Sequence, residues 1–288
     1  MTTSPAITTH TVRTPGATIT YDVRGEVGTG VPLLVFGSPM DASGFPTLAG
    51  HFPDRPVVTY DPRGTGRSTR DQDGESTPQQ HAQDLAAIVE AIGGGPVDAF
   101  GSSGGAVNAL AWAAARPEQL RTLVAHEPPL LQQLPDAVAA RAAVADIGLT
   151  YQREGFGPGM VKFILLVGHE GEIAEGFRFP PVDPAQFGMP AQDDGRRDDP
   201  LLAQNLSTCT GYRLDVPALT TGGVRIVVAR GEGSGRQFAA RAAAGTADAL
   251  GLPVTMFPGD HAGFLGGEYG QTGEPDAFAA RLREVLGR

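Results

Sequence analysis

The chain has 288 residues, of which 41% are hydrophobic and 19% are charged, as in an ordinary globular protein with a sizeable core. Its formal net charge of −10 argues against nucleic acid or an anionic membrane as a partner, because binding to either needs clustered cations. A single cysteine, Cys209, excludes an internal disulfide framework and a thiolate metal cage.

Strand and helix patterns alternate through the first part of the chain. Residues 8–24 predict a hairpin around Pro15-Gly16, because both arms alternate and are rich in β-branched residues. Buried apolar runs of strand length then alternate with amphipathic helical segments. The expected strands are 31–37, 55–61, 96–101 and 121–127, and the expected helices are a short one near 45–52, then 77–93 and 104–116.

The pattern changes after Pro128-Pro129. Residues 130–215 contain helical segments joined by Pro- and Gly-rich links, which indicates an inserted cap or lid of helices. Strands at 224–231 and 253–259 and helices near 236–250 and 275–287 then restore the alternation. We therefore predict an α/β fold: a mostly parallel twisted sheet of about eight strands with helices on both faces. Its core would comprise residues 1–129 and 216–288, with the cap at 130–215.

The stretch GSSGG, residues 101–105, lies where an expected strand meets an apolar helix. With Ser103 at its centre it reads G-x-S-x-G, the pattern of a nucleophile elbow. Such a turn holds the serine in strained backbone geometry, and larger side chains at the flanking positions would collide across it. The hydroxyl would project at the carboxyl end of the sheet, beside free N–H groups at the start of the helix.

A serine needs a base to become a good nucleophile. His261, in FPGDHAGF, follows the last expected strand and is the best candidate among six histidines. The other five are expected in the N-terminal hairpin, on outer helices, in the cap, or packed in the sheet.

Four segments together carry a family resemblance: FGSPM (36–40), DPRGTGRS (61–68), GSSGG and PGDHAGF. With them, the chain resembles the α/β-hydrolase fold family over nearly its whole length except the cap. The resemblance implies an oxyanion hole built from the N–H groups of Gly104 and Ser38. This sequence departs from the family at one point: it has Phe36-Gly37 where the family has a His-Gly pair. The resemblance also gives DPRGTGRS a structural role in bracing the loop beside the site.

The acid that would orient His261 is left with two candidates. The family usually places it shortly after the strand at 224–231, where Ser234 now stands, and a serine does not stabilise an imidazolium as a carboxylate does. Glu127 ends the preceding strand, a position that some members of the family use for the acid. Glu232 is two residues before the usual position. We favour Glu127, because a structural role does not explain a buried carboxylate at the end of a strand, directly before Pro128-Pro129.

The sequence thus predicts a serine hydrolase that cleaves an ester, lactone or thioester, without a cofactor or metal. The alternatives are a lyase, C–C hydrolase or perhydrolase at the same site, or a hydrolase fold retained as a ligand receptor. Apolar cap residues favour a small-to-medium apolar substrate: Phe156, Met160, Phe163, Ile164, Phe177, Phe179 and Phe187.

The partner and location follow from the same composition. The N-terminus lacks the charged and apolar regions of a signal peptide. The longest apolar run, residues 160–168, is too short to cross a bilayer. We expect a cytoplasmic monomer or homodimer that acts on a small molecule and binds neither membrane nor nucleic acid.

Overall fold

A nine-stranded sheet forms the centre of the molecule in the computed structural model, which describes residues 6–71 and 76–287. The strand order is β1-β2-β4-β3-β6-β7-β8-β9, and β5 pairs with β2. All pairs from β4 to β9 are parallel, whereas β1 and β5 pair with β2, and β2 with β4, in antiparallel fashion. The strands are β1 (Ile7–Thr14), β2 (Ala17–Arg24), β3 (Leu33–Phe36), β4 (Val57–Tyr60), β5 (Thr69–Arg70), β6 (Val97–Ser102), β7 (Leu120–His126), β8 (Arg225–Gly231) and β9 (Val254–Phe257).

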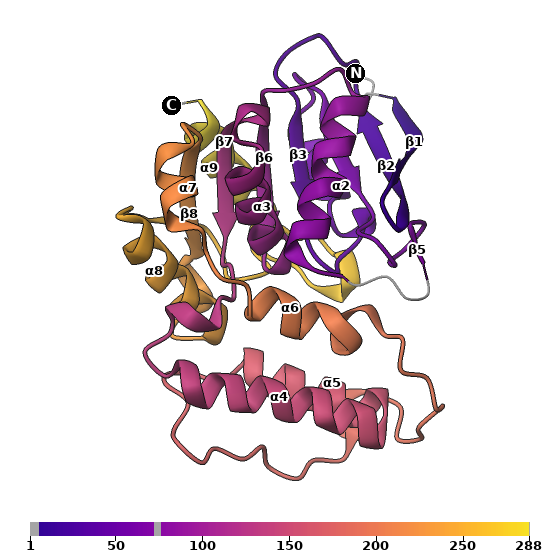
Figure 1. Cartoon of the computed structure of the whole chain (residues 1–288), viewed down its shortest axis with the longest axis vertical. Helices are drawn as coiled ribbons and strands as arrows, with labels where there is room; N and C mark the ends of the chain where they lie inside the picture. Colours follow the sequence, from indigo (N-terminus) through magenta and orange to yellow (C-terminus); the bar gives the residue numbers. More distant parts are fainter. Residues whose placement is uncertain (1–5, 72–75, 288) are drawn as a thin grey trace.

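Helices cover both faces of this sheet, and the predicted fold class is confirmed (Figure 1). One apolar cluster joins the sheet to α2, α3, α7 and α8, and a second joins its other face to α1 and α9. The helices are α1 (Pro46–Gly50), α2 (Pro78–Ala91), α3 (Gly104–Ala115), α7 (Val216–Thr221), α8 (Phe238–Leu250) and α9 (Pro275–Leu286). Strand β3 is buried at all four positions, as expected for a strand covered on both sides.

Local signals explain where the expected elements begin. In α2, Thr77 and Gln80 cap each other's backbone N–H groups and Pro78 occupies the first turn, so the helix starts where the sequence indicates. Gly16 has a φ of 74°, which a glycine adopts without strain at the turn between β1 and β2. The two-residue strand β5 was not expected, because it is shorter than any pattern that periodicity can detect.

Residues 130–215 form no strand of the sheet. Helices α4 (Ala137–Glu154) and α5 (Phe156–Val167) pair with each other in a layer beyond the sheet, and α6 (Leu206–Thr210) lies between that layer and the sheet (Figure 1). A third apolar cluster joins these helices to one another and to the start of α8. Short helical turns are η1 (Ala42–Gly44), η2 (Pro117–Gln119), η3 (Leu131–Gln133), η4 (Pro184–Phe187), η5 (Leu201–Asn205), η6 (Glu232–Ser234) and η7 (Glu268–Gly270).

The segment DPRGTGRS lies beside the loop that follows β3. The Asp61 carboxylate accepts hydrogen bonds from the backbone N–H of Ala42 at 3.1 Å and of Arg67 at 2.7 Å. The Ser68 hydroxyl donates to the Asp61 carbonyl at 2.6 Å. These contacts tie the end of β4 to the segment after Ser38. Across the described residues, no helix is both long and apolar enough to cross a membrane.

Candidate active site

Ser103 lies in a strained turn between β6 and α3. Its φ of 56° and ψ of −125° belong to a region that non-glycine residues rarely occupy. The two flanking glycines cannot be larger: a Cβ on Gly101 would lie 2.7 Å from the Gly105 carbonyl oxygen, and one on Gly105 would lie 2.8 Å from the Gly37 backbone. The crowding that the sequence indicates is therefore present on both sides of the turn.

The loop after β3 packs directly against this turn. A Cβ on Gly104 would lie 2.5 Å from the Ser38 carbonyl oxygen, and Ser38 is buried. Gly104 is the first residue of α3, where backbone N–H groups have no partner within the helix. The two segments expected to supply oxyanion donors are thus adjacent.

His261 and Glu127 are brought together from segments that lie far apart in the sequence. The Glu127 Oε2 atom is 2.5 Å from His261 Nδ1, and its Oε1 atom accepts a hydrogen bond from the Gly231 N–H at 2.9 Å. Glu127 has a φ of 50°, and its own N–H donates to the Ala229 carbonyl oxygen of β8. This unusual backbone places the carboxylate at the junction of β7 and β8, beneath the half-buried imidazole.

The charge of this carboxylate is maintained by its neighbour. Burial by itself would raise the pKa of Glu127, but the hydrogen bond and positive charge of His261 lower it to about 2. Glu127 is only 1% exposed and is ionised at neutral pH. It can therefore fix the orientation of the imidazole and stabilise its protonated form.

The other acidic residues considered for this role do not pair with His261 within the described part of the chain. Glu232 is exposed at the start of η6, and within the described part of the chain it does not contact His261. Asp260 is also exposed, and its carboxylate accepts the Ala262 N–H at 2.8 Å. Ser234 is fully buried. The geometry favours Glu127 over Glu232 as the partner of His261.

A second histidine lies under the first. His126 is fully buried, its ring is stacked 5.9 Å from that of His261, and its Nδ1 atom is 3.2 Å from the Ser102 hydroxyl. Burial lowers the pKa of His126 to about 4, so it is neutral at pH 7. The expectation that this histidine is packed agrees with its burial.

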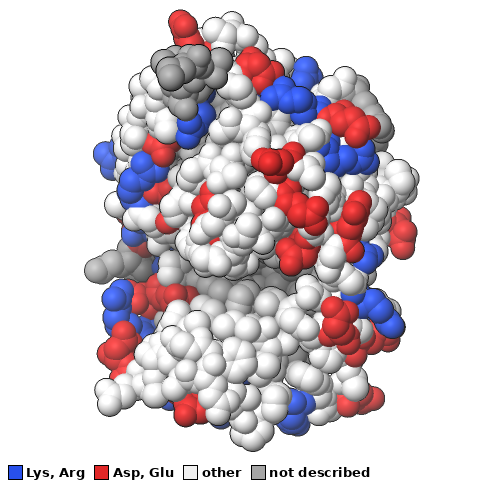
Figure 2. Space-filling model, turned by 180° about the vertical axis from the view of Figure 1, so that it is seen from behind, with Lys and Arg blue, Asp and Glu red and all other residues white. Residues whose placement is uncertain are grey.

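A cavity of about 610 Å³ joins Ser103, His261 and Glu127 to the segment at 130–215. Its walls are mainly apolar, and Phe163 and Ile164 are the members of the apolar cap set that reach it, among the described residues. None of the described residues that line it is Lys or Arg. Figure 2 shows a hollow between the upper and lower parts of the molecule, bordered largely by uncharged side chains.

Two polar residues of this wall, Asn205 and Cys209, were not identified from the sequence as part of the site. They lie at and after a helical turn without a periodic apolar pattern, so no sequence signal distinguished them from the rest of the segment. Over residues 6–71 and 76–287, no group of three or more His, Cys, Asp or Glu side chains is arranged to hold a metal ion.

Comparison with known proteins places this geometry in context. The model of the alpha/beta hydrolase fold family matches residues 32–154. The chain is 30% identical over 286 residues to the uncharacterized hydrolase YraK of Bacillus subtilis, covering 97% of this chain and 96% of that protein. It is 29% identical over 254 residues to the 2-(acetamidomethylene)succinate hydrolase of Mesorhizobium japonicum, covering 84% and 85%.

Solved structures share the same architecture. A thermophilic esterase from Thermogutta terrifontis has a TM-score of 0.67 at 21% identity, with 98% of each chain covered. The enol-lactonase from Burkholderia xenovorans has a TM-score of 0.67 at 16% identity, covering 97% of this chain and all of the other. At such low identities the likeness concerns the fold.

Proposed function

Because the chain belongs to the α/β-hydrolase fold family, we propose that it is a serine hydrolase acting on a carboxylic ester, lactone or thioester. One observation carries the proposal. The Glu127–His261 pair, with 2.5 Å between its atoms, lines the same cavity as the strained Ser103. A buried carboxylate, an imidazole and an elbow serine are the parts that acyl transfer to water requires.

In the proposed reaction, His261 takes the Ser103 proton as the hydroxyl attacks the substrate carbonyl, with Glu127 stabilising the imidazolium. The N–H groups of Gly104 and Ser38 hold the negative oxygen of the tetrahedral intermediate. The imidazolium then protonates the departing alcohol or thiol, leaving an acyl-serine. Water, deprotonated by His261, attacks the acyl carbon, and the serine regains its proton as the acid leaves.

We propose residues 130–215 as a cap that selects the substrate. This segment supplies much of the apolar wall, including Phe163, Ile164 and Leu206. With two carboxylates, Glu127 and Asp260, and no Lys or Arg among the described lining residues, the cavity has no permanently charged cation to neutralise an anionic substrate. An uncharged acyl group of small to medium size fits these walls best. A succinate derivative, as named for the Mesorhizobium relative, fits them poorly.

A fluorophosphonate probe tests the nucleophile. The wild-type chain should be labelled at one site, and Ser103→Ala should abolish both labelling and turnover of p-nitrophenyl butyrate. Ser102→Ala is the matched neighbour control, because Ser102 faces His126 and should still permit labelling at Ser103. Absence of labelling in the folded wild type, together with tight binding of a small ligand, would instead indicate a receptor.

A further inference from the structure

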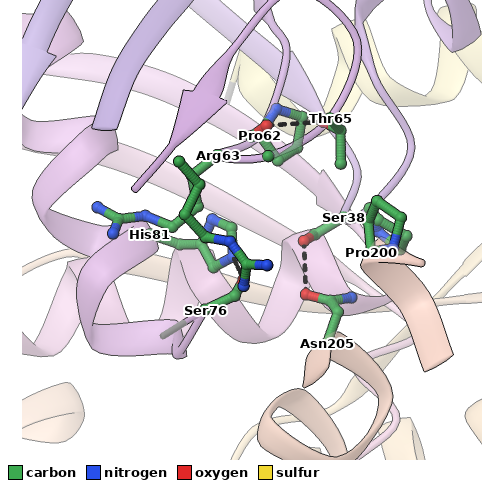
Figure 3. Close-up of a pocket in the computed structure, with 11 residues that line it drawn as sticks. Ser38, Pro62, Arg63, Thr65, Ser76, His81, Pro200 and Asn205 are labelled. Atoms are coloured by element: carbon green, nitrogen blue, oxygen red, sulfur yellow. Dashed lines mark hydrogen bonds between the residues drawn. The ribbon is translucent and has the colours of Figure 1, made fainter. Parts of the chain in front are cut away.

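Asn205 ends a π-helical turn, η5, that reaches the elbow from the cap side. It is 3% exposed and lines the cavity together with Ser38 and Gly104. Single π-helical turns are frequent at functional sites. Ser38 and Asn205 are joined by a hydrogen bond, and both line a second, small pocket of about 10 Å³ (Figure 3).

The orientation of the Asn205 amide is fixed by two donors. Its Oδ1 atom accepts from the Ser38 hydroxyl at 3.0 Å and from the Cys209 thiol at 3.3 Å. Burial raises the pKa of Cys209 to about 12, so the thiol keeps its proton and remains a donor. With two donors at the oxygen, the nitrogen side of the amide points away from them.

That nitrogen is directed at the elbow. A Cβ on Gly104 would lie 3.3 Å from Asn205 Nδ2. Within residues 6–71 and 76–287, Nδ2 has no hydrogen-bond partner, and it is not sealed from solvent: it is open to the cavity that Asn205 lines. A donor that has no protein partner and opens onto the cavity is available to a ligand atom bound there.

We propose that Asn205 Nδ2 is a third hydrogen-bond donor to the carbonyl oxygen of the substrate, beside the N–H groups of Gly104 and Ser38. This role rests on the proposed function. The donor comes from the cap, so correct seating of the cap completes the oxyanion hole. The Ser38 residue then acts twice, through its N–H on the substrate and through its hydroxyl on Asn205.

The test measures the rate of fluorophosphonate labelling and the kcat for p-nitrophenyl butyrate. Asn205→Ala removes the donor, and Asn205→Asp keeps the size and the Oδ1 acceptor but places a negative oxygen beside the oxyanion. We expect both rates to fall about 10–100-fold in Asn205→Ala and further in Asn205→Asp, with KM changed less than about threefold. Ser207→Ala, an exposed position two residues away, is the matched control and should stay within twofold.

A purely structural role would lower the unfolding temperature of the variants together with their rates, whereas loss of the donor lowers the rates of variants that keep the wild-type unfolding temperature. Thermal unfolding identifies the variants that fold. Asp has nearly the same volume as Asn, so Asn205→Asp can still be tested if Asn205→Ala does not fold. If Asn205→Asp labels at the wild-type rate, the role of Asn205 is refuted while the serine mechanism stands. If the wild type itself is not labelled, the proposed function fails first.

Discussion

Replacement of Glu127 by Gln tests the proposed triad most directly. The substitution keeps the size of the side chain and removes its charge from a position 2.5 Å from His261 Nδ1. The Gly231 N–H can still donate to the amide oxygen, so the fold should tolerate the change. A loss of activity would then report on the carboxylate itself.

The size of the effect follows from the pKa of Glu127, which is lowered from 4.5 to about 2. Each pKa unit corresponds to about 1.4 kcal/mol, so the native site favours the carboxylate by about 3 kcal/mol, a factor of about 10²–10³. An amide also donates to Nδ1 and holds the imidazole in the wrong tautomer, which raises the loss toward about 10⁴. We expect kcat to fall about 10²–10⁴-fold.

Steady-state hydrolysis of p-nitrophenyl butyrate measures this loss, with Glu232→Gln as the matched control. Glu232 is exposed and does not contact His261 among the described residues, so its variant should stay within twofold of the wild type. Retention of more than a tenth of the wild-type kcat in Glu127→Gln would refute the assignment. An equal loss in both variants would refute it as well.

Two further predictions concern stability. Because the pKa of Glu127 is lower in the folded state, the stability that its carboxylate contributes is complete above about pH 4.5 and is lost as the pH falls toward 2. Urea titration of wild type and Glu127→Gln should show a difference in unfolding free energy that shrinks over that range. A difference that stays constant with pH would contradict this prediction. Gly105→Ala places a methyl group 2.8 Å from the Gly37 backbone and should lower the unfolding free energy by about 1–3 kcal/mol and remove most of the activity. Gly148→Ala, inside α4 with no atom within 4 Å of the new methyl group, should raise the unfolding free energy by about 0.5–1 kcal/mol. Equal shifts of the two unfolding temperatures would refute this contrast.

Most of the sheet could be predicted because its signals are local. The continuous apolar run of β3, the capping residues of α2 and the small residues around Ser103 each report their own environment. The position of His261 after the last strand singled it out among six histidines, and in the structure this histidine contacts Glu127.

What the sequence left open depends on tertiary contacts. The choice between Glu127 and Glu232 turns on a positive φ at Glu127 and on an N–H from β8, neither of which leaves a pattern in the residues nearby. The role inferred for Asn205 depends on a π-helical turn and on Ser38, which is 167 positions away. Contacts between residues so far apart in the sequence leave no periodic pattern from which they could be predicted.

The position of Glu127 beside His261 has a geometric explanation. Strands β7 and β8 are parallel neighbours, with His126 paired to Ala229, so their carboxyl ends lie side by side. Adjacent strands are about 4.8 Å apart, and a carboxylate at the end of either one approaches the same face of His261. From β7, the side chain must be long and its backbone must turn inward, which the extra methylene of a glutamate and the φ of 50° at Glu127 provide. Ser234 is buried near the end of β8, and a carboxylate at that position would repel the buried carboxylate of Glu127.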